Sequence, residues 1–153
     1  MARVRLNQTA EVAESHRWMF ERMEANGDVL NIFRALSHSP EALRRFMKFG
    51  QYFLSEGKLE AGLRELAILR AGWLCRSPYE FSQHVSFGRR AGLSDDQIRA
   101  LCDPQTAAAG TFSPQELAVL RFAGEMTADA TVSDATFVGV REFLDEVLLG
   151  LVR

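Results

Sequence analysis

The sequence predicts an all-α protein, and three of its features support this prediction. Apolar residues recur at the intervals of an amphipathic helix along most of the chain. No stretch alternates polar and apolar residues as a half-buried strand does. Ser-Pro pairs and Ser-x-x-Glu/Gln motifs precede several apolar stretches, as they do at helix N-termini. A length of 153 residues with 47% hydrophobic residues suits one domain, so we expect a compact single-domain helical bundle of about seven helices.

The predicted elements begin after residues 1–8, which we expect to form a loose leader. A helical stripe starts at Thr9 and closes at Asn26-Gly27, and Asp28 is placed to cap a short helix over residues 29–36. The residues of the stripe are Val12, His16, Met19, Phe20 and Met23. Ser39-Pro40 then opens a helix that runs to about residue 55 and is ended by Gly57. Its inward residues are expected to be Leu43, Phe46, Met47, Gly50, Phe53 and Leu54.

A helical hairpin over residues 60–91 is expected at the centre of the fold. Its first helix, residues 60–75, has almost no polar face, which is typical of a buried helix. Its second helix, residues 78–91, has Ser77 as the expected N-cap and Pro78 at the first helical position. Gly92 is placed to end this helix.

Three further helices are predicted after the hairpin. Capping-box motifs at residues 94–97 and 113–116 open helices that reach to about residues 102 and 129, with a loop over residues 104–112 between them. Ser133 is placed to cap the last helix. Its apolar residues are Phe137, Val140, Phe143, Leu144, Val147 and Leu148.

Polar residues inside the hairpin are the candidates for chemistry. Glu65 and Arg70 lie within an apolar run, where a charged side chain needs a partner, a wet cavity or a subunit interface. Glu80 lies one helical turn before His84. If the two helices pack antiparallel, then Glu65, Glu80 and His84 converge on one pocket.

The run RELAILRAGWLCRSPYEFSQHVSFGRRAGLSDDQI, residues 64–98, resembles the core of the carboxymuconolactone decarboxylase and alkylhydroperoxidase D-like superfamily. The peroxidase branch of that superfamily carries a glutamate, eleven residues, and then Cys-x-x-Cys-x-x-x-His. On this spacing the glutamate is Glu65 and the histidine is His84, while Ser77 and Glu80 occupy the two cysteine positions. Without the redox pair, the Tyr-Glu-Phe-x-Gln-His motif at residues 79–84 is similar to the decarboxylase branch.

The resemblance implies an alkylhydroperoxidase D-like helical subunit that assembles into trimers or hexamers. It also implies a cofactor-independent lyase of aromatic compound catabolism, acting on a small carboxylated lactone or keto acid, in which a histidine delivers the proton that decarboxylation requires. The expected catalytic residues are His84, Glu65 and Glu80, and the expected substrate contacts are Arg70, Tyr79 and Trp73. No metal and no cofactor are expected.

Structural interpretations remain open for each catalytic candidate. His84 suits a hydrogen-bonded imidazole between two helices, and Glu65 suits a buried ion pair with Arg64 or Arg70. Glu80 completes a capping box with Ser77. The alternative functions are a non-catalytic or stress-related oligomer on the same scaffold and a thiol hydroperoxide reductase. The latter requires that Cys75 pairs with Cys102.

The charge and composition of the chain limit the binding partners and the cellular location that we expect. A net charge of −2 gives no basic patch for nucleic acid or an acidic membrane. The three histidines have no metal-ligand spacing: His16 is expected in the core and His38 in a loop. Two cysteines without redox spacing and no apolar run of membrane-spanning length predict a soluble cytoplasmic protein. Family members commonly carry another helical segment beyond the last predicted helix, and this chain is expected to be short there. We therefore expect its final apolar stretch to pack on a neighbouring subunit instead. Its residues are Leu148, Leu149, Leu151 and Val152.

Overall fold

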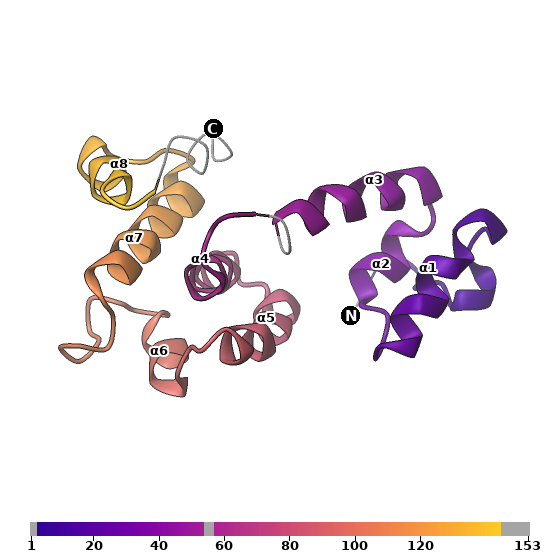
Figure 1. Cartoon of the computed structure of the whole chain (residues 1–153), viewed down its shortest axis with the longest axis horizontal. Coiled ribbons are helices and arrows are strands. Elements are labelled where there is room, and N and C mark those ends of the chain that lie inside the picture. The colour runs from indigo at the N-terminus through magenta and orange to yellow at the C-terminus, as the bar shows by residue number, and fades with distance from the viewer. Residues whose placement is uncertain (1–2, 54–56, 145–153) are drawn as a thin grey trace. The chain divides into compact units, whose positions relative to one another are not determined.

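The computed structural model describes residues 3–53 and 57–144 (Figure 1). The helical residues among them form α-helices, one turn of 3-10 helix and a short π-helical stretch at residues 52–53, and the described residues contain no strand. The predicted all-α class is therefore confirmed. The chain divides into two compact units, Met1–Gly57 and Lys58–Arg153, which are taken in turn.

The first unit is built from one 3-10 turn and three α-helices. These are η1 (Thr9–Glu11), α1 (Glu14–Ala25), α2 (Asn31–Leu36) and α3 (Pro40–Gln51). A cluster of buried apolar side chains holds them together, and its members are Val12, Met19, Phe20, Val29 and Leu43. The amphipathic stripe of the first helix thus supplies much of this core, as its spacing predicts.

Three boundaries in the first unit differ from the sequence prediction. The helix expected from Thr9 is interrupted because Val12 is extended, and its side chain is 1% exposed in the core. Asp28 accepts a hydrogen bond from the backbone of Val29 rather than capping α2, which begins at Asn31. Asn7, expected in a loose leader, is buried and donates to Ser37 Oγ at 3.0 Å.

Helix α3 buries less of its surface than its aromatic sequence suggests. Leu43 is fully buried, whereas the expected inward residue Phe46 is 42% exposed. The prediction for Phe46 is therefore wrong, because that side chain lies at the edge of the buried face rather than on it. Leu54 and Ser55, at the predicted end of this helix, lie outside the described residues.

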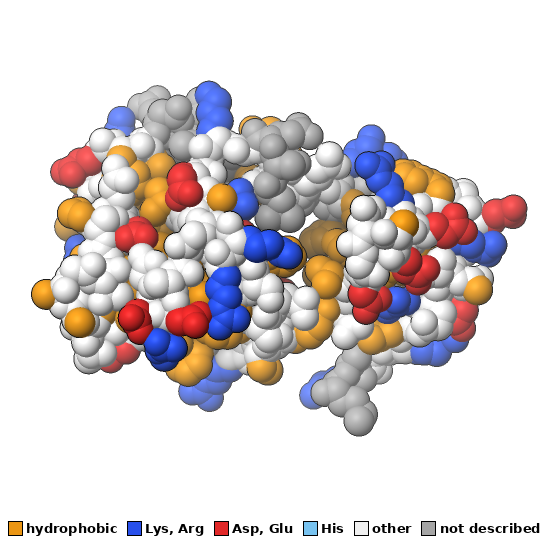
Figure 2. Space-filling view, turned by 60° about the horizontal axis from the view of Figure 1, so that its bottom comes forward, with side chains coloured by type: hydrophobic (Ala, Val, Ile, Leu, Met, Phe, Trp, Pro, Cys, Tyr) orange, Lys and Arg blue, Asp and Glu red, His pale blue; other side chains and the backbone are white. Residues whose placement is uncertain are grey.

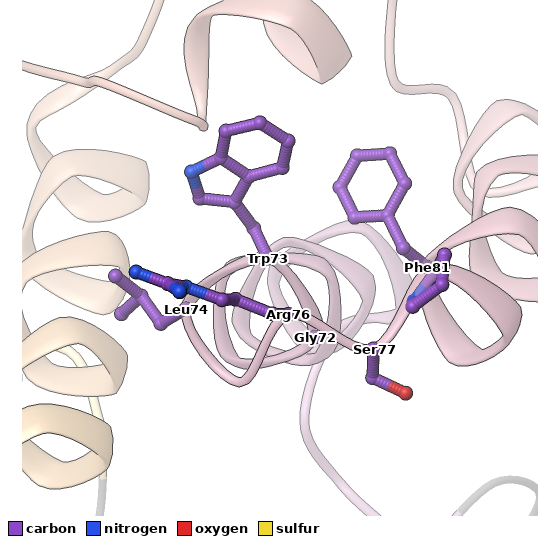
Figure 3. Close-up of a pocket in the computed structure, with 7 residues that line it drawn as sticks. Gly72, Trp73, Leu74, Arg76, Ser77 and Phe81 are labelled. Carbon is purple, nitrogen blue, oxygen red and sulfur yellow. The ribbon is translucent and has the colours of Figure 1, made fainter.

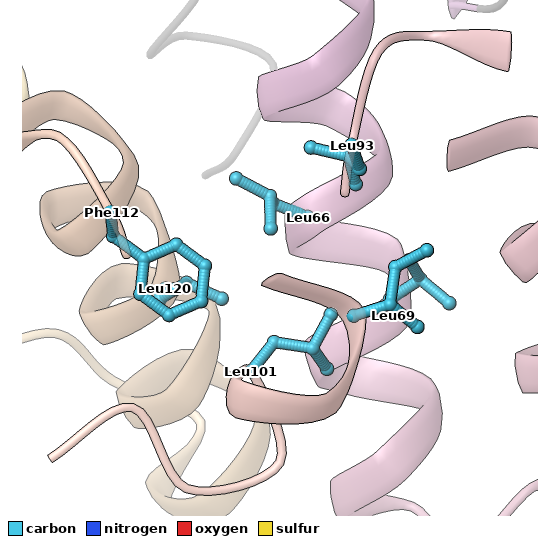
Figure 4. Close-up of a cluster of buried hydrophobic side chains, with 7 residues drawn as sticks. Leu66, Leu69, Leu93, Leu101, Phe112 and Leu120 are labelled. Carbon is cyan, nitrogen blue, oxygen red and sulfur yellow. The ribbon is translucent and has the colours of Figure 1, made fainter. Parts of the chain in front are cut away.

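The second unit carries the central hairpin and the helices around it. Its elements are α4 (Ala61–Leu74), α5 (Pro78–Arg90), α6 (Asp95–Ala100), α7 (Pro114–Asp129) and α8 (Asp134–Arg141). Helix α4 packs against both α5 and α7, and α7 packs against α8. As Figure 4 shows, leucines of α4 meet side chains from the α6 region and α7 in a shared core. The members of this core are Leu66, Leu69, Leu93, Ile98, Leu101, Phe112 and Leu120.

Small residues let α4 and α5 approach each other closely. A Cβ placed on Gly72 would lie 3.6 Å from the backbone nitrogen of Phe81. A Cβ on Gly88 would lie 3.3 Å from Leu69 Cδ1, tighter than an ordinary contact. The hairpin is therefore antiparallel and tightly packed, and this register sets residues near position 65 of α4 opposite residues near position 84 of α5.

Serine caps define most helix starts in the second unit. Ser94 and Ser113 each form a complete capping box, with Gln97 and Glu116 respectively, and Ser133 caps α8 through the backbone of Thr136. These three predictions are confirmed. The last described helix ends at Arg141, so the apolar residues expected beyond it lie outside the described residues. They are Val147, Leu148, Leu149, Leu151 and Val152.

The surface mixes both signs of charge. Figure 2 shows Lys and Arg side chains interspersed with Asp and Glu over the face in view. Pairs such as Arg89–Asp95 and Arg99–Asp96 hold such side chains together. Among the described helices, none is both long enough and apolar enough to cross a bilayer.

Candidate functional site

Glu65 is a carboxylate buried in the middle of α4. Its side chain is 2% exposed. Its Oε1 lies 3.3 Å from Arg64 Nε, and its Oε2 lies 2.7 Å from His84 Nδ1 on α5. A buried charge is tolerated only when partners replace the lost water, and both oxygens of Glu65 have such a partner.

His84 lies between two carboxylates. Its Nδ1 faces Glu65, and its Nε2 lies 3.2 Å from Glu80 Oε1. Carboxylates only accept hydrogen bonds, whereas a neutral imidazole has a single N–H. The Nδ1 contact is a hydrogen bond, and the Nε2 contact is a close approach of a ring nitrogen and a carboxylate oxygen. The imidazole therefore has an acid or base partner at each of its two nitrogens, as a proton-transfer group requires.

The two sides of His84 differ in their access to solvent. The side chain of Glu80 is 45% exposed and that of Glu65 is 2% exposed, with His84 between them at 14%. The ring of Phe87 covers part of the imidazole, at a centroid distance of 5.3 Å. The Nδ1 side is thus fixed in the protein interior, and the Nε2 side opens toward solvent through Glu80.

Glu80 is available for this contact because it does not cap α5. Ser77 occupies the N-cap position, but no side-chain cap bond forms there. In a capping box, the glutamate would accept a hydrogen bond from the Ser77 N–H. Here that N–H donates to the Gly72 carbonyl instead, at 2.9 Å. The capping-box interpretation of Glu80 is therefore wrong, and the i, i+4 spacing to His84 determines where its carboxylate lies.

The turn between α4 and α5 is a Schellman motif. Ser77 N–H bonds to Gly72, and Arg76 N–H bonds to the Trp73 carbonyl at 3.0 Å. This motif requires a left-handed residue after the helix, and Arg76 takes that conformation with a φ of 52°. Glycine usually fills such a position because it has no Cβ. The backbone at Arg76 is therefore strained.

A hollow of about 690 Å³ opens beside this turn (Figure 3). Its walls are mostly apolar, and the residues that line it are Gly72, Trp73, Leu74, Arg76, Ser77, Pro78 and Phe81. The Trp73 and Phe81 rings lie 6.0 Å apart at a tilt of 57°. Glu65, Glu80 and His84 are not among the lining residues. The three side chains therefore meet one another, as expected, but they do not line this hollow.

The expected substrate contacts lie in different places. Trp73 is 50% exposed and lines the hollow, and Tyr79 is 37% exposed on the first turn of α5. Arg70 points elsewhere, because its Nη1 donates to the carbonyls of Leu101 and Cys102 at 3.0 and 2.6 Å. The structure therefore brings together Glu65, His84 and Glu80 and leaves Arg70 apart from them.

Sequence reasoning missed Arg76. This residue follows α4 directly, at a position where a glycine is expected, and the segment Cys75-Arg76-Ser77-Pro78 contains none. A helix end without glycine, two residues before the next helix begins, was the available signal for a strained residue at the turn.

The remaining titratable groups form no second centre in the described chain. No group of His, Cys, Asp and Glu there is arranged to hold a metal ion. His16 is half-buried beside Ser15, and His38 is exposed with Nε2 at 2.8 Å from the Arg5 carbonyl. Cys75 and Cys102 are both free. Burial raises the pKa of the Cys102 thiol, although Arg70 acts in the opposite direction, so its thiolate is disfavoured.

Comparisons with known proteins agree with the architecture. A crystal structure described as the alkylhydroperoxidase AhpD core of an uncharacterized peroxidase-related protein from Ralstonia eutropha JMP134 is similar, with a TM-score of 0.81 and 20% sequence identity. The match covers 98% of this chain and 80% of that one, which confirms the alkylhydroperoxidase D-like fold. No curated protein matches the sequence. The model of the carboxymuconolactone decarboxylase family matches residues 40–125, more than half of the chain and all of the Glu65–His84 region, and the chain therefore belongs to that family.

Proposed function

We propose that this protein is a cofactor-independent lyase that decarboxylates a small carboxylated lactone or keto acid, with His84 as the proton-transfer residue. The observation that carries this proposal is the continuous chain of contacts from buried Glu65 through His84 to half-exposed Glu80. Membership of the carboxymuconolactone decarboxylase family supports the reaction class.

Each member of the chain has a distinct role in this proposal. Glu65 accepts from Nδ1 of His84, which fixes the ring orientation and leaves Nε2 for the reaction. Arg64 helps to hold the Glu65 carboxylate in place. Glu80 lies on the Nε2 side, where it exchanges protons with His84 and solvent.

The reaction balances without a redox partner. Loss of CO₂ breaks the carbon–carbon bond to the carboxylate, and the electron pair of that bond delocalises into a neighbouring carbonyl of the substrate. The proton on His84 Nε2 then adds to the carbon that lost CO₂ and takes up that pair. His84 regains a proton from Glu80 or water. One proton is consumed for each CO₂ released, and no oxidant or reductant is needed.

The alternatives have weaker support. A thiol hydroperoxide reductase needs a reactive thiolate, whereas burial raises the pKa of Cys102 and Ser77 and Glu80 stand where the peroxidase branch has its two cysteines. A non-catalytic scaffold accounts for the contact of buried Glu65 with His84, but it assigns no role to the half-exposed Glu80 carboxylate beside Nε2. The trimer or hexamer expected for this family is part of the proposal, and light scattering of the purified protein tests it.

The decisive variant is His84→Asn, because asparagine retains a donor near the Nδ1 position but cannot transfer a proton. We expect CO₂ release from the best substrate in a panel of carboxylated lactones and keto acids to fall by roughly 100-fold or more. In D₂O, the wild-type product should carry one deuterium on the carbon that lost CO₂.

The matched control is His38→Asn, which changes an exposed histidine in the other unit and should leave CO₂ release unchanged. A folded His84→Asn protein that releases CO₂ at the wild-type rate would refute the proposal. No CO₂ release from any panel member by wild-type protein would favour the non-catalytic alternative.

A further inference from the structure

Arg76 is a cation at the edge of the hollow with no partner in the described chain. Within residues 3–53 and 57–144 its guanidinium has no hydrogen bond and no ion pair. Other arginines of the hairpin are engaged: Arg70 donates to backbone carbonyls, and Arg89 pairs with Asp95. Arg76 is thus available to an anion from outside the chain.

The backbone conformation that places Arg76 at the edge of the hollow is energetically unfavourable. Residues with a Cβ are disfavoured in the left-handed conformation, because the Cβ approaches the following carbonyl oxygen, and Arg76 adopts it with a φ of 52°. Backbone strain of this kind clusters at functional sites, and an observed outlier justifies a hypothesis of function. The side chain that this strain presents lines the hollow.

The other residues that line the hollow suit a flat apolar group of a ligand. In Figure 3 the rings of Trp73 and Phe81 extend from α4 and α5 on the same side of the turn. Pro78 and Leu74 add further apolar surface. A volume of about 690 Å³ lies within the range of roughly 300–1,000 Å³ that is usual for small-molecule sites.

We propose that this hollow binds an aromatic or unsaturated ring acid, with the Arg76 guanidinium paired to its carboxylate and Trp73 and Phe81 against its ring. A guanidinium matches a carboxylate with two parallel hydrogen bonds. The inference rests on the proposed function in one respect, that such an acid is the substrate on which His84 acts. Phe81 lines the hollow and lies three residues before His84 on α5, a rise of about 4.5 Å along the helix axis, so the hollow and the proton-transfer residue lie on neighbouring turns of one helix.

Tryptophan fluorescence tests the binding directly. The chain has two tryptophans, and Trp18 is 58% exposed on α1. Trp18→Phe therefore leaves Trp73 as the single reporter, inside the proposed site. Benzoate is the probe, and benzamide is its neutral counterpart of similar shape.

We expect benzoate to change the Trp73 emission saturably and benzamide to bind at least tenfold more weakly. In the same background, Arg76→Gln should weaken benzoate binding by roughly tenfold or more. Arg99→Gln, which removes an exposed arginine of α6, should leave it unchanged. Arg76→Gly should lose benzoate binding while melting no earlier than the parent, because glycine relieves the strain.

The inference is overturned if benzoate does not bind, if benzamide binds equally well, or if Arg76→Gln binds benzoate as the parent does. His84→Asn separates this inference from the proposed function, because the variant should lose CO₂ release and keep benzoate affinity. If the protein releases no CO₂ but binds benzoate through Arg76, only the proposed function fails. If CO₂ release depends on His84 but benzoate binding does not depend on Arg76, only this inference fails.

Discussion

The turns before α5 and α7 share the motif Ser-Pro-x-Glu, yet their glutamates do different things. At Ser113 the capping box is complete: Ser113 Oγ accepts from the Glu116 backbone at 3.2 Å, and Glu116 accepts from the Ser113 N–H at 2.7 Å. At Ser77 neither bond forms, and Glu80 lies against His84 instead. The same four-residue motif therefore caps one helix and supplies the candidate site at the other.

The difference arises from what precedes each serine. Ser113 follows a loop, so its backbone N–H is not used to end a preceding helix. Ser77 follows α4 almost directly, and its N–H closes the Schellman motif on Gly72. The single Ser77 N–H cannot donate well to both the Gly72 carbonyl and the Glu80 carboxylate. The short turn therefore takes away the N–H that would have held Glu80 in a capping box. The tight hairpin thus leaves the Glu80 carboxylate free to contact His84.

The largest expected effect comes from neutralising the two glutamates separately. Glu80→Gln should lower CO₂ release by roughly 100-fold, because an amide cannot exchange the proton of His84. It should hardly change the melting temperature, because the Glu80 side chain is 45% exposed. Glu116→Ala should do the reverse, with full CO₂ release and a lower melting temperature, since it removes the side chain that accepts from the Ser113 N–H in the cap of α7. Equal loss of CO₂ release in both variants would contradict the assignment.

Local sequence rules predicted much of this architecture. The helix starts at Ser94, Ser113 and Ser133 follow from capping motifs, which depend on residues within one turn. The meeting of Glu65 with His84 follows from an antiparallel hairpin together with helical periodicity. Both inferences need only short-range geometry.

The contacts that the sequence did not predict depend on parts of the chain that such rules do not include. Arg70 was expected to meet a substrate anion, but its guanidinium is engaged by carbonyls at the end of α6, more than thirty residues away. The role of Glu80 depended on whether the Ser77 N–H was already used by α4. Arg76 was missed because its left-handed conformation follows from the length of the turn and not from its own side chain.

A smaller effect is expected from removing the two serine hydroxyls. Ser113→Ala removes a cap bond and should lower the free energy of unfolding by about 1 kcal/mol. Ser77→Ala should change it by only a few tenths of a kcal/mol, because Ser77 makes no side-chain cap bond. Urea unfolding followed by circular dichroism measures both values. A loss at Ser77 as large as that at Ser113 would mean that its hydroxyl caps α5 in solution.

The smallest effect concerns Glu125, whose carboxylate lies at the start of α8. Glu125 accepts from Thr136 Oγ1 and from the Ser133 N–H at the beginning of α8, and these bonds hold the pKa of its carboxyl below the ordinary value near 4.5. A lowered pKa in the folded state stabilises the protein above the unfolded pKa, and this contribution disappears as the pH falls through the folded value. Unfolding measured from about pH 6 to pH 3 should therefore show a shallower acid-induced loss of stability in Glu125→Gln than in wild type. Identical slopes would mean that the Glu125 carboxylate does not support α8.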